Sequence, residues 1–147
     1  MEWIEALRGA TVGLDTAPLI YFIEEHPVYL PRLEPFFRAA GHGEFRVVTS
    51  LVTLLEVLVQ PLRRGRQDLV REYREILLHS SDLIAMPLTA EIVEDAARIR
   101  ADYNLRTPDA IQLATVRRSG ASWFLTNDAD LPPMPGISLL VVDRLPG

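Results

Sequence analysis

The feature that most limits the possible folds is the alternation of short apolar runs with longer segments of helical periodicity. The apolar runs are rich in β-branched side chains and have the length of buried strands. We predict strands at residues 11–14, 45–49, 83–86, 122–125 and 137–142. Because helical segments separate most of these runs, we expect an α/β fold with a mainly parallel central sheet of about five strands, flanked by helices.

The helical segments are expected at residues 16–25, 30–40, 51–60, 63–79, 89–103 and 107–120. Segment 51–60 is apolar almost all round, so we expect it to lie inside the molecule, with Ser50 as its N-terminal cap. Pro61 is expected to end this helix, because proline lacks the N–H that the next helical hydrogen bond needs.

The composition predicts one globular domain over residues 1–147, since 48% of the residues are hydrophobic and 24% are charged. No run of about 18 apolar residues occurs, and the acidic N-terminal segment is too weakly apolar for a signal peptide. We therefore expect a cytoplasmic protein without a membrane segment. The chain contains no cysteine, which excludes disulfides, thiolate zinc sites and thiol catalysis.

The chain has more acidic than basic residues, and its basic residues are all of one type. The formal net charge is −5, so any contact with a nucleic acid must come from local groups of arginine. All 15 basic residues are arginine. The absence of lysine removes every mechanism that requires an ammonium group.

Two aspartates follow predicted strands. Asp15 comes directly after strand 11–14, and Asp128 comes shortly after strand 122–125. Because functional groups of an open parallel sheet gather beyond the carboxyl ends of its strands, we expect both aspartates at the same edge. Each also has a simpler explanation, as a helix N-cap for Asp15 and as a turn residue for Asp128.

Glu56 lies in the apolar segment 51–60, where its charge has almost no solvated face. Thr53, Glu56 and Gln60 are spaced three and four residues apart, so they form a narrow polar stripe that can line a site. A structural ion pair with an arginine and a bound cation would both satisfy the buried charge.

Asp109 lies in the first turn of predicted helix 107–120, where the helix dipole favours a carboxylate in any case. It becomes significant together with Asp15, Glu56 and Asp128, because an α/β fold can bring four acidic residues from four segments to one edge of the sheet. Converging carboxylates without lysine repel one another unless a divalent cation binds or a pKa rises. Oxygen ligands select hard cations, so Mg²⁺ or Mn²⁺ is expected, with hydrolysis of phosphodiester bonds as the chemistry. The three histidines show no ligand spacing.

These four acidic residues lie in four segments: LDTAPLIY at 14–21, TSLVTLLEV at 49–57, TPDAIQLA at 107–114 and LTND at 125–128. These segments resemble the motifs of PIN domains, and more narrowly those of the VapC-type toxins of bacterial toxin-antitoxin systems. Their order and spacing agree with the family from residue 11 to residue 142. Any one segment is a weak signal, whereas the four together are specific.

The resemblance implies a parallel sheet between helices and an acidic pocket built from Asp15, Glu56, Asp109 and Asp128. It implies endoribonuclease activity that depends on Mg²⁺ or Mn²⁺, with Asp15 and Asp109 as the main metal ligands and the other two acids completing the shell. By the same resemblance, Thr126 supports the site by hydrogen bonding. A homodimer and a small antitoxin protein that blocks the pocket are implied as well, so we expect the toxin of a type II pair acting on RNA.

Arg106 is our candidate for contact with RNA phosphates, because it precedes the helix that carries Asp109. Arg71 and Arg74 are interpreted instead as part of a solvated helix face that also carries glutamates. Tyr21 and Phe22 are interpreted as core or dimer-surface residues rather than as platforms for stacking bases.

Three alternatives remain at this level: a non-catalytic PIN-like scaffold, a housekeeping PIN nuclease and a receiver-type phosphoacceptor domain. A degenerate scaffold would have lost some of the acidic positions, which are all filled here. Receiver domains also gather aspartates at this edge, but they normally require a lysine. Dinucleotide and P-loop modules are weaker still, because the chain has neither a Gly-x-Gly-x-x-Gly turn nor a Gly-Lys-Ser/Thr loop.

Overall fold

The computed structural model describes residues 1–146 and contains one sheet of five strands. The strands are β1 (Thr11–Leu14), β2 (Arg46–Ser50), β3 (Leu83–Met86), β4 (Trp123–Thr126) and β5 (Ser138–Val141). Their order across the sheet is β3-β2-β1-β4-β5, and every neighbouring pair is parallel. The predicted α/β class with a parallel central sheet is confirmed.

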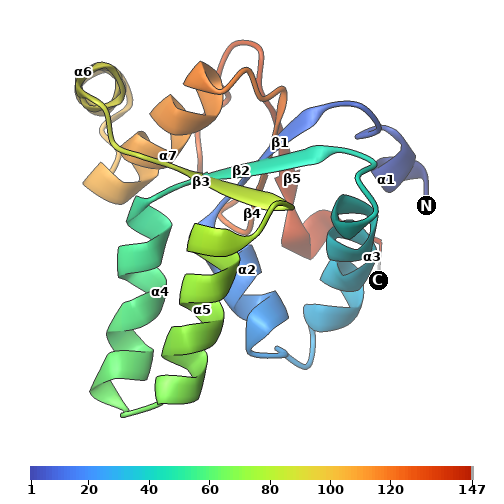
Figure 1. The fold of residues 1–147 in the computed structure, drawn as a ribbon. Coiled ribbons are helices and arrows are strands. Elements are labelled where there is room, and N and C mark those ends of the chain that lie inside the picture. Colours follow the sequence, from blue (N-terminus) through green and yellow to red (C-terminus); the bar gives the residue numbers. More distant parts are fainter. Residues whose placement is uncertain (147) are drawn as a thin grey trace.

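Helices cover both faces of this sheet (Figure 1). They are α1 (Glu2–Glu5), α2 (Thr16–Ile23), α3 (Leu30–Gly41), α4 (Val52–Arg63), α5 (Gln67–His79), α6 (Ala90–Tyr103) and α7 (Thr107–Arg118), followed by the 3-10 turn η1 (Val142–Arg144). Helices α6 and α7 pack on one face around a core that includes Ile99, Leu113 and Phe124. Helices α1 to α5 pack on the other face, where Leu33 and Phe36 are buried. No helix within residues 1–146 is both long enough and apolar enough to cross a membrane.

The predictions about the end and the burial of α4 are wrong. Pro61 does not end the helix, which continues to Arg63; Gly65, with a φ of 67°, forms the turn before α5. A proline near the last turn removes one hydrogen bond, and the residues after it can still donate to earlier carbonyls. The helix is also not interior, because Leu55 and Leu62 are 65% and 54% exposed.

The exposure of α4 has a simple geometric reason. Its buried residues are Thr53, Val57 and Pro61, which are four residues apart and therefore lie on one face of the helix. The opposite face is apolar in sequence, and no segment within residues 1–146 covers its exposed Leu55 and Leu62. The N-cap of α4 is Leu51 and not the predicted Ser50, whose Oγ accepts a hydrogen bond from the Val52 N–H at 3.1 Å.

Helix α7 approaches the sheet closely at Gly13, in the middle of β1. A Cβ atom at this position would lie closer than 3.0 Å to the side chains of Val116 on α7 and Phe124 on β4. Real Cβ atoms essentially never lie so close to other heavy atoms, so glycine is the residue that permits this packing distance.

Candidate active site

The four predicted carboxylates lie around one pocket at the carboxyl edge of the sheet. The chain order reverses between β1 and β4, which are neighbours in the sheet, so their carboxyl ends form a topological switch point. A pocket of about 300 Å³ opens there. Its lining residues are Asp15, Thr16, Ala17, Ile20, Tyr21, Glu56, Arg106, Asp109, Asn127 and Asp128. We call it the acidic pocket.

Asp15 is both the N-cap of α2 and a wall of the acidic pocket. One carboxylate oxygen accepts a hydrogen bond from the Thr16 N–H at 2.8 Å, and the other accepts one from the Thr126 hydroxyl at 2.8 Å. Burial raises the pKa of Asp15, and the charges of Asp109 and Glu56 raise it further, while the two hydrogen bonds act in the opposite direction. The helix-cap explanation and the site explanation of Asp15 therefore hold together.

Glu56 reaches the acidic pocket from α4 and receives a hydrogen bond from the Thr16 hydroxyl at 2.8 Å. Within residues 1–146, no arginine lies at ion-pair distance from this carboxylate. The alternative of a structural ion pair for Glu56 therefore has no support in the described part of the chain.

Asp109 enters the pocket from the first turn of α7 and pairs with Arg106 at 3.2 Å. The side chain of Arg106 is 79% exposed, whereas that of Asp109 is 17% exposed. Since an ion pair with such an exposed partner is weakened by solvent, Arg106 is free to exchange its carboxylate for another anion at little energetic penalty.

Asp128 has a turn role in addition to its place in the pocket. Its carboxylate accepts a hydrogen bond from the Asp130 N–H at 2.9 Å, and its own N–H donates to the Thr126 hydroxyl at 3.0 Å. Thr126 is completely buried at the end of β4. Its hydroxyl thus joins the loop of Asp128 to the carboxylate of Asp15.

The chemistry of these side chains fits a hard divalent cation, because the lining offers four carboxylates and neither histidine nor thiol. As placed, however, no three acidic or histidine side chains within residues 1–146 are gathered closely enough to hold an ion. The Asp109 carboxylate pairs with Arg106, whereas the carboxylates of Glu56 and Asp128 each accept a hydrogen bond on one oxygen. Since a carboxylate that accepts one hydrogen bond keeps other lone pairs for a cation, the contact that a cation would have to displace is that of Arg106 with Asp109.

Sequence reasoning missed five residues of the pocket, of which Tyr21 and Asn127 have polar side chains that contact each other. Tyr21 was expected in the core or at a dimer surface, yet it lines the acidic pocket and receives a hydrogen bond from the Asn127 amide at 3.4 Å. Helical spacing contained the signal, because Ala17 and Tyr21 are four residues apart, as are Thr16 and Ile20, so the two pairs form neighbouring rows along α2. Asn127 lies inside the motif that ends with Asp128, but a turn residue is the usual role for asparagine there.

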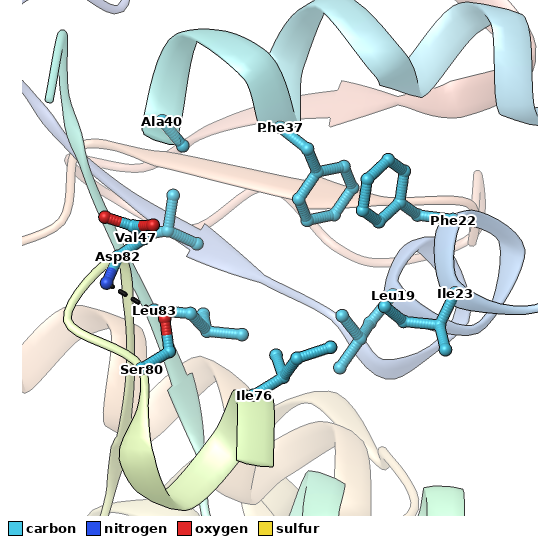
Figure 2. Close-up of a pocket in the computed structure, with 10 residues that line it drawn as sticks. All are labelled: Leu19, Phe22, Ile23, Phe37, Ala40, Val47, Ile76, Ser80, Asp82 and Leu83. Carbon is cyan, nitrogen blue, oxygen red and sulfur yellow. Dashed lines mark hydrogen bonds between the residues drawn. The ribbon is translucent and has the colours of Figure 1, made fainter. Parts of the chain in front are cut away.

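A second cavity lies on the other side of α2. It has a volume of about 180 Å³, and Figure 2 shows its side chains converging from α2, α3, α5 and the sheet. The rings of Phe22 and Phe37 stack at its edge with their centroids 4.1 Å apart. The lining is apolar except for Ser80 and Asp82. This apolar cavity offers no group for acid, base or metal chemistry apart from that one carboxylate.

The sequence matches the family model of the PIN domain over residues 12–136, so the chain belongs to the PIN-domain family. The family predicted from the four motifs is thereby confirmed. PIN domains are nucleases, that is, hydrolases of phosphodiester bonds. A search of curated proteins found no match.

Solved structures of bacterial toxin-antitoxin proteins have the same fold. VapBC2 from Rickettsia felis, bound to a DNA fragment from its promoter, matches with a TM-score of 0.69 and 16% identity, covering 89% of this chain and 98% of that one. VapC20 from Mycobacterium tuberculosis, described as a sarcin-ricin loop cleaving toxin, matches with a TM-score of 0.68 and 18% identity, covering 81% and 91%. DNA-bound VapBC from Salmonella typhimurium matches with a TM-score of 0.66 and 18% identity, covering 90% and 98%.

Proposed function

We propose that this protein is an endoribonuclease dependent on Mg²⁺ or Mn²⁺, and the toxin of a type II toxin-antitoxin pair. The observation that carries the proposal is the acidic pocket: four carboxylates from four separate segments line one opening at the switch point of a PIN-family chain. Such a set of oxygen donors is the ordinary environment of a cation that acts on phosphodiesters.

Asp15 and Asp109 are the main metal ligands in this proposal, and Glu56 and Asp128 complete the shell or orient water. When bound, a divalent cation supplies charge neutralisation for the phosphate and a lowered pKa for water. Thr126 keeps the Asp15 carboxylate in place through its hydrogen bond. The raised pKa of Asp15 is also consistent with this role, because a cation favours the ionised form that burial disfavours.

Arg106 is the proposed contact for RNA. Its guanidinium lies at the edge of the acidic pocket and pairs with Asp109 through a solvent-exposed contact. Arg106 can bind a phosphate oxygen in place of Asp109, which leaves that carboxylate available to a cation. One exchange of partners would therefore prepare both the substrate contact and a metal ligand.

The proposed partners are a small antitoxin protein and a second copy of this chain. Support for the antitoxin comes from the shared fold, since several structures with that fold are toxin-antitoxin complexes. RNA as substrate is supported by the toxin described as cleaving the sarcin-ricin loop. The cysteine-free composition suits the reducing cytoplasm, where we place the activity.

The direct test is cleavage of RNA by the purified chain with Mg²⁺, with Mn²⁺ and with a chelator. We expect cleavage with either ion, none after chelation, and none in Asp15→Asn or Asp109→Asn proteins whose circular dichroism is unchanged. Cleavage that persists in both variants would contradict the assignment of the site. Growth arrest on induction of the gene, relieved by a neighbouring short reading frame, would support the toxin role.

A non-catalytic PIN-like scaffold is the second candidate. One observation favours it, namely that no three acidic side chains within the described residues are gathered around a common point. The cleavage assay separates the two, because a scaffold stays inactive at any concentration of either ion. Cleavage without effect on growth would indicate a housekeeping nuclease instead.

A further inference from the structure

A group of buried polar side chains lies directly beneath the acidic pocket. Thr49 and Thr53 are fully buried, and Gln112 is 1% exposed. Burying an amide or a hydroxyl destabilises the fold unless its hydrogen bonds are replaced. We call these three residues, together with the half-buried Thr16 that lines the pocket above them, the polar cluster, and its hydrogen bonds show what it holds in place.

The orientation of Gln112 follows from its neighbours. Its amide oxygen accepts a hydrogen bond from the Ser50 N–H at 3.2 Å, and a backbone N–H can only donate. The amide nitrogen therefore faces the other way and donates to the hydroxyl oxygen of Thr53. Helix α7 is in this way joined to the start of α4.

The single protons of the three hydroxyls limit what Thr53 can do. Thr16 donates to the Glu56 carboxylate at 2.8 Å, and Thr49 donates to the Leu14 carbonyl at 2.7 Å. Neither acceptor can donate in return when Glu56 is ionised. Thr53 lies 3.0 Å from both of these hydroxyls, so it has to supply the proton for whichever contact forms.

Donation from Thr53 to Thr16 completes a chain from the Gln112 amide through two hydroxyls to a carboxylate. Each hydrogen bond in such a chain polarises the next, and the last is strengthened by the negative charge of Glu56. Donation from Thr53 to Thr49 would end at a neutral carbonyl. The chain that ends at Glu56 is therefore the favoured arrangement.

The same residues join the two helices that carry Glu56 and Asp109. Gln112 follows Asp109 by three residues on α7, and Glu56 follows Thr53 by three residues on α4, so each helix presents one carboxylate and one neutral polar group on the same face. The two carboxylates repel each other at the pocket. The contact between Gln112 and Thr53 opposes that repulsion one turn below it.

We infer that Gln112 is a positioning residue of the acidic pocket, which fixes the Glu56 carboxylate through Thr53 and Thr16. The inference rests on the proposed function as far as cation binding is concerned. The placement of Glu56 can be measured without any cation. Gln112 itself touches neither substrate nor metal in this scheme.

The test compares Gln112→Met and Thr53→Val, which remove the hydrogen bonds at similar volume, with Thr53→Ser, which keeps the hydroxyl. Thr115→Val is the matched control, because Thr115 is equally buried on α7 but donates only to the Ile111 carbonyl within its own helix. Mn²⁺ affinity is measured by calorimetry on the full chain, and folding is followed by thermal unfolding.

We expect Gln112→Met and Thr53→Val to weaken Mn²⁺ binding by about three- to tenfold, less than the roughly 10- to 100-fold seen when a direct partner of a metal ligand is removed, because Thr16 lies between them and Glu56. Thr53→Ser should restore the affinity, and Thr115→Val should leave it unchanged even if it lowers the melting temperature. The double variant Gln112→Met/Thr53→Val should lose little more than either single variant, because both break one chain. Equal losses in the Thr115 control, or affinities within twofold of wild type in both single variants, would overturn the inference.

A metal-free measurement keeps this inference separate from the proposed function. The carboxyl ¹³C resonance of Glu56, recorded at one neutral pH without metal, should move in Gln112→Met and Thr53→Val and return in Thr53→Ser. A wild-type protein that binds no Mn²⁺ but shows these movements contradicts the proposed function and supports the positioning of Glu56. A resonance that stays in place in both variants overturns the positioning role.

Discussion

The acidic pocket and the apolar cavity lie on opposite sides of α2 and are held by different forces. In the acidic pocket, mutually repelling carboxylates are held by hydrogen bonds from Thr16 and Thr126. In the apolar cavity, packing holds the apolar side chains, as in the stacked pair of Phe22 and Phe37. Substitutions on the pocket side of α2 should therefore change mainly activity, and those on the cavity side should change mainly stability.

The largest expected effect is that of Asp15→Asn on RNA cleavage. Loss of the charge removes a proposed metal ligand, and a ligand contributes several kcal/mol to the transition state, so the rate should fall by roughly a hundredfold or more. Single-turnover cleavage with saturating Mn²⁺ measures this. A rate within tenfold of wild type would show that the acidic pocket is not the site of cleavage.

The same substitution should not destabilise the protein at neutral pH. Burial is the main cause of the raised pKa of Asp15, so the fold disfavours its ionised form. The contribution of Asp15 to stability is therefore greatest below its ordinary pKa and is lost as the pH rises through the raised value. Urea unfolding should show Asp15→Asn to be at least as stable as wild type at pH 7, with the difference shrinking at acid pH.

Phe22→Ala should show the opposite behaviour. Removing a half-buried ring from the apolar cavity should reduce the free energy of unfolding by roughly 2–3 kcal/mol, less than the loss for a fully buried phenylalanine. Cleavage by the remaining folded protein should stay within about twofold. Urea unfolding and cleavage at low temperature measure the two effects, with Phe22→Leu as the milder control. Lost cleavage in a fully folded variant would show that the two sides of α2 are coupled.

Thr126→Val tests the hydrogen bond that supports Asp15 in the acidic pocket. It removes the hydrogen bond that favours the ionised form of Asp15, so the pKa of Asp15 should rise further. The cleavage rate at neutral pH should fall about tenfold, as for other partners of metal ligands. The acidic limb of the pH-rate profile should move to higher pH, and Thr126→Ser should restore it. A profile that keeps its position would exclude the proposed support of Asp15.

Arg106→Gln should have the smallest effect. Since its pair with Asp109 is exposed to solvent, stability should change by less than about 1 kcal/mol. Loss of one phosphate contact should raise KM a few-fold and reduce the salt dependence of RNA binding by about one unit of slope. Arg118→Gln is the matched control, because Arg118 pairs with Asp95 and does not line the pocket. An equal change in the control would assign the effect to overall charge.

The position of Asp15 and Asp128 could be predicted because it depends on topology alone. The carboxyl ends of neighbouring parallel strands meet at one edge, and strand patterns are short-range features of a sequence. Glu56 could be predicted because an ionised side chain in an apolar helix needs a partner. All four acidic residues accordingly line the same pocket.

Apart from the helix end predicted at Pro61, the errors concern what depends on distant parts of the chain. The exposure of Leu55 could not be predicted, because an apolar residue shows nothing about whether a neighbouring helix covers it. The role of Gln112 was equally hidden, since its partners Ser50 and Thr53 are 62 and 59 residues away in sequence. Side-chain pairing over such separations requires the three-dimensional arrangement.

The smallest side chain of β1 has a consequence for the opening of the pocket. Gly13 allows Val116 of α7 to rest directly on the sheet, and α7 carries both Asp109 and Gln112. A methyl group on this strand would overlap the Val116 side chain, so that α7 would have to move outward unless that side chain gave way, and an outward movement would carry the Asp109 carboxylate away from the other three. A residue without any functional group thus helps to set the distance between the Asp109 carboxylate and the other three acidic side chains.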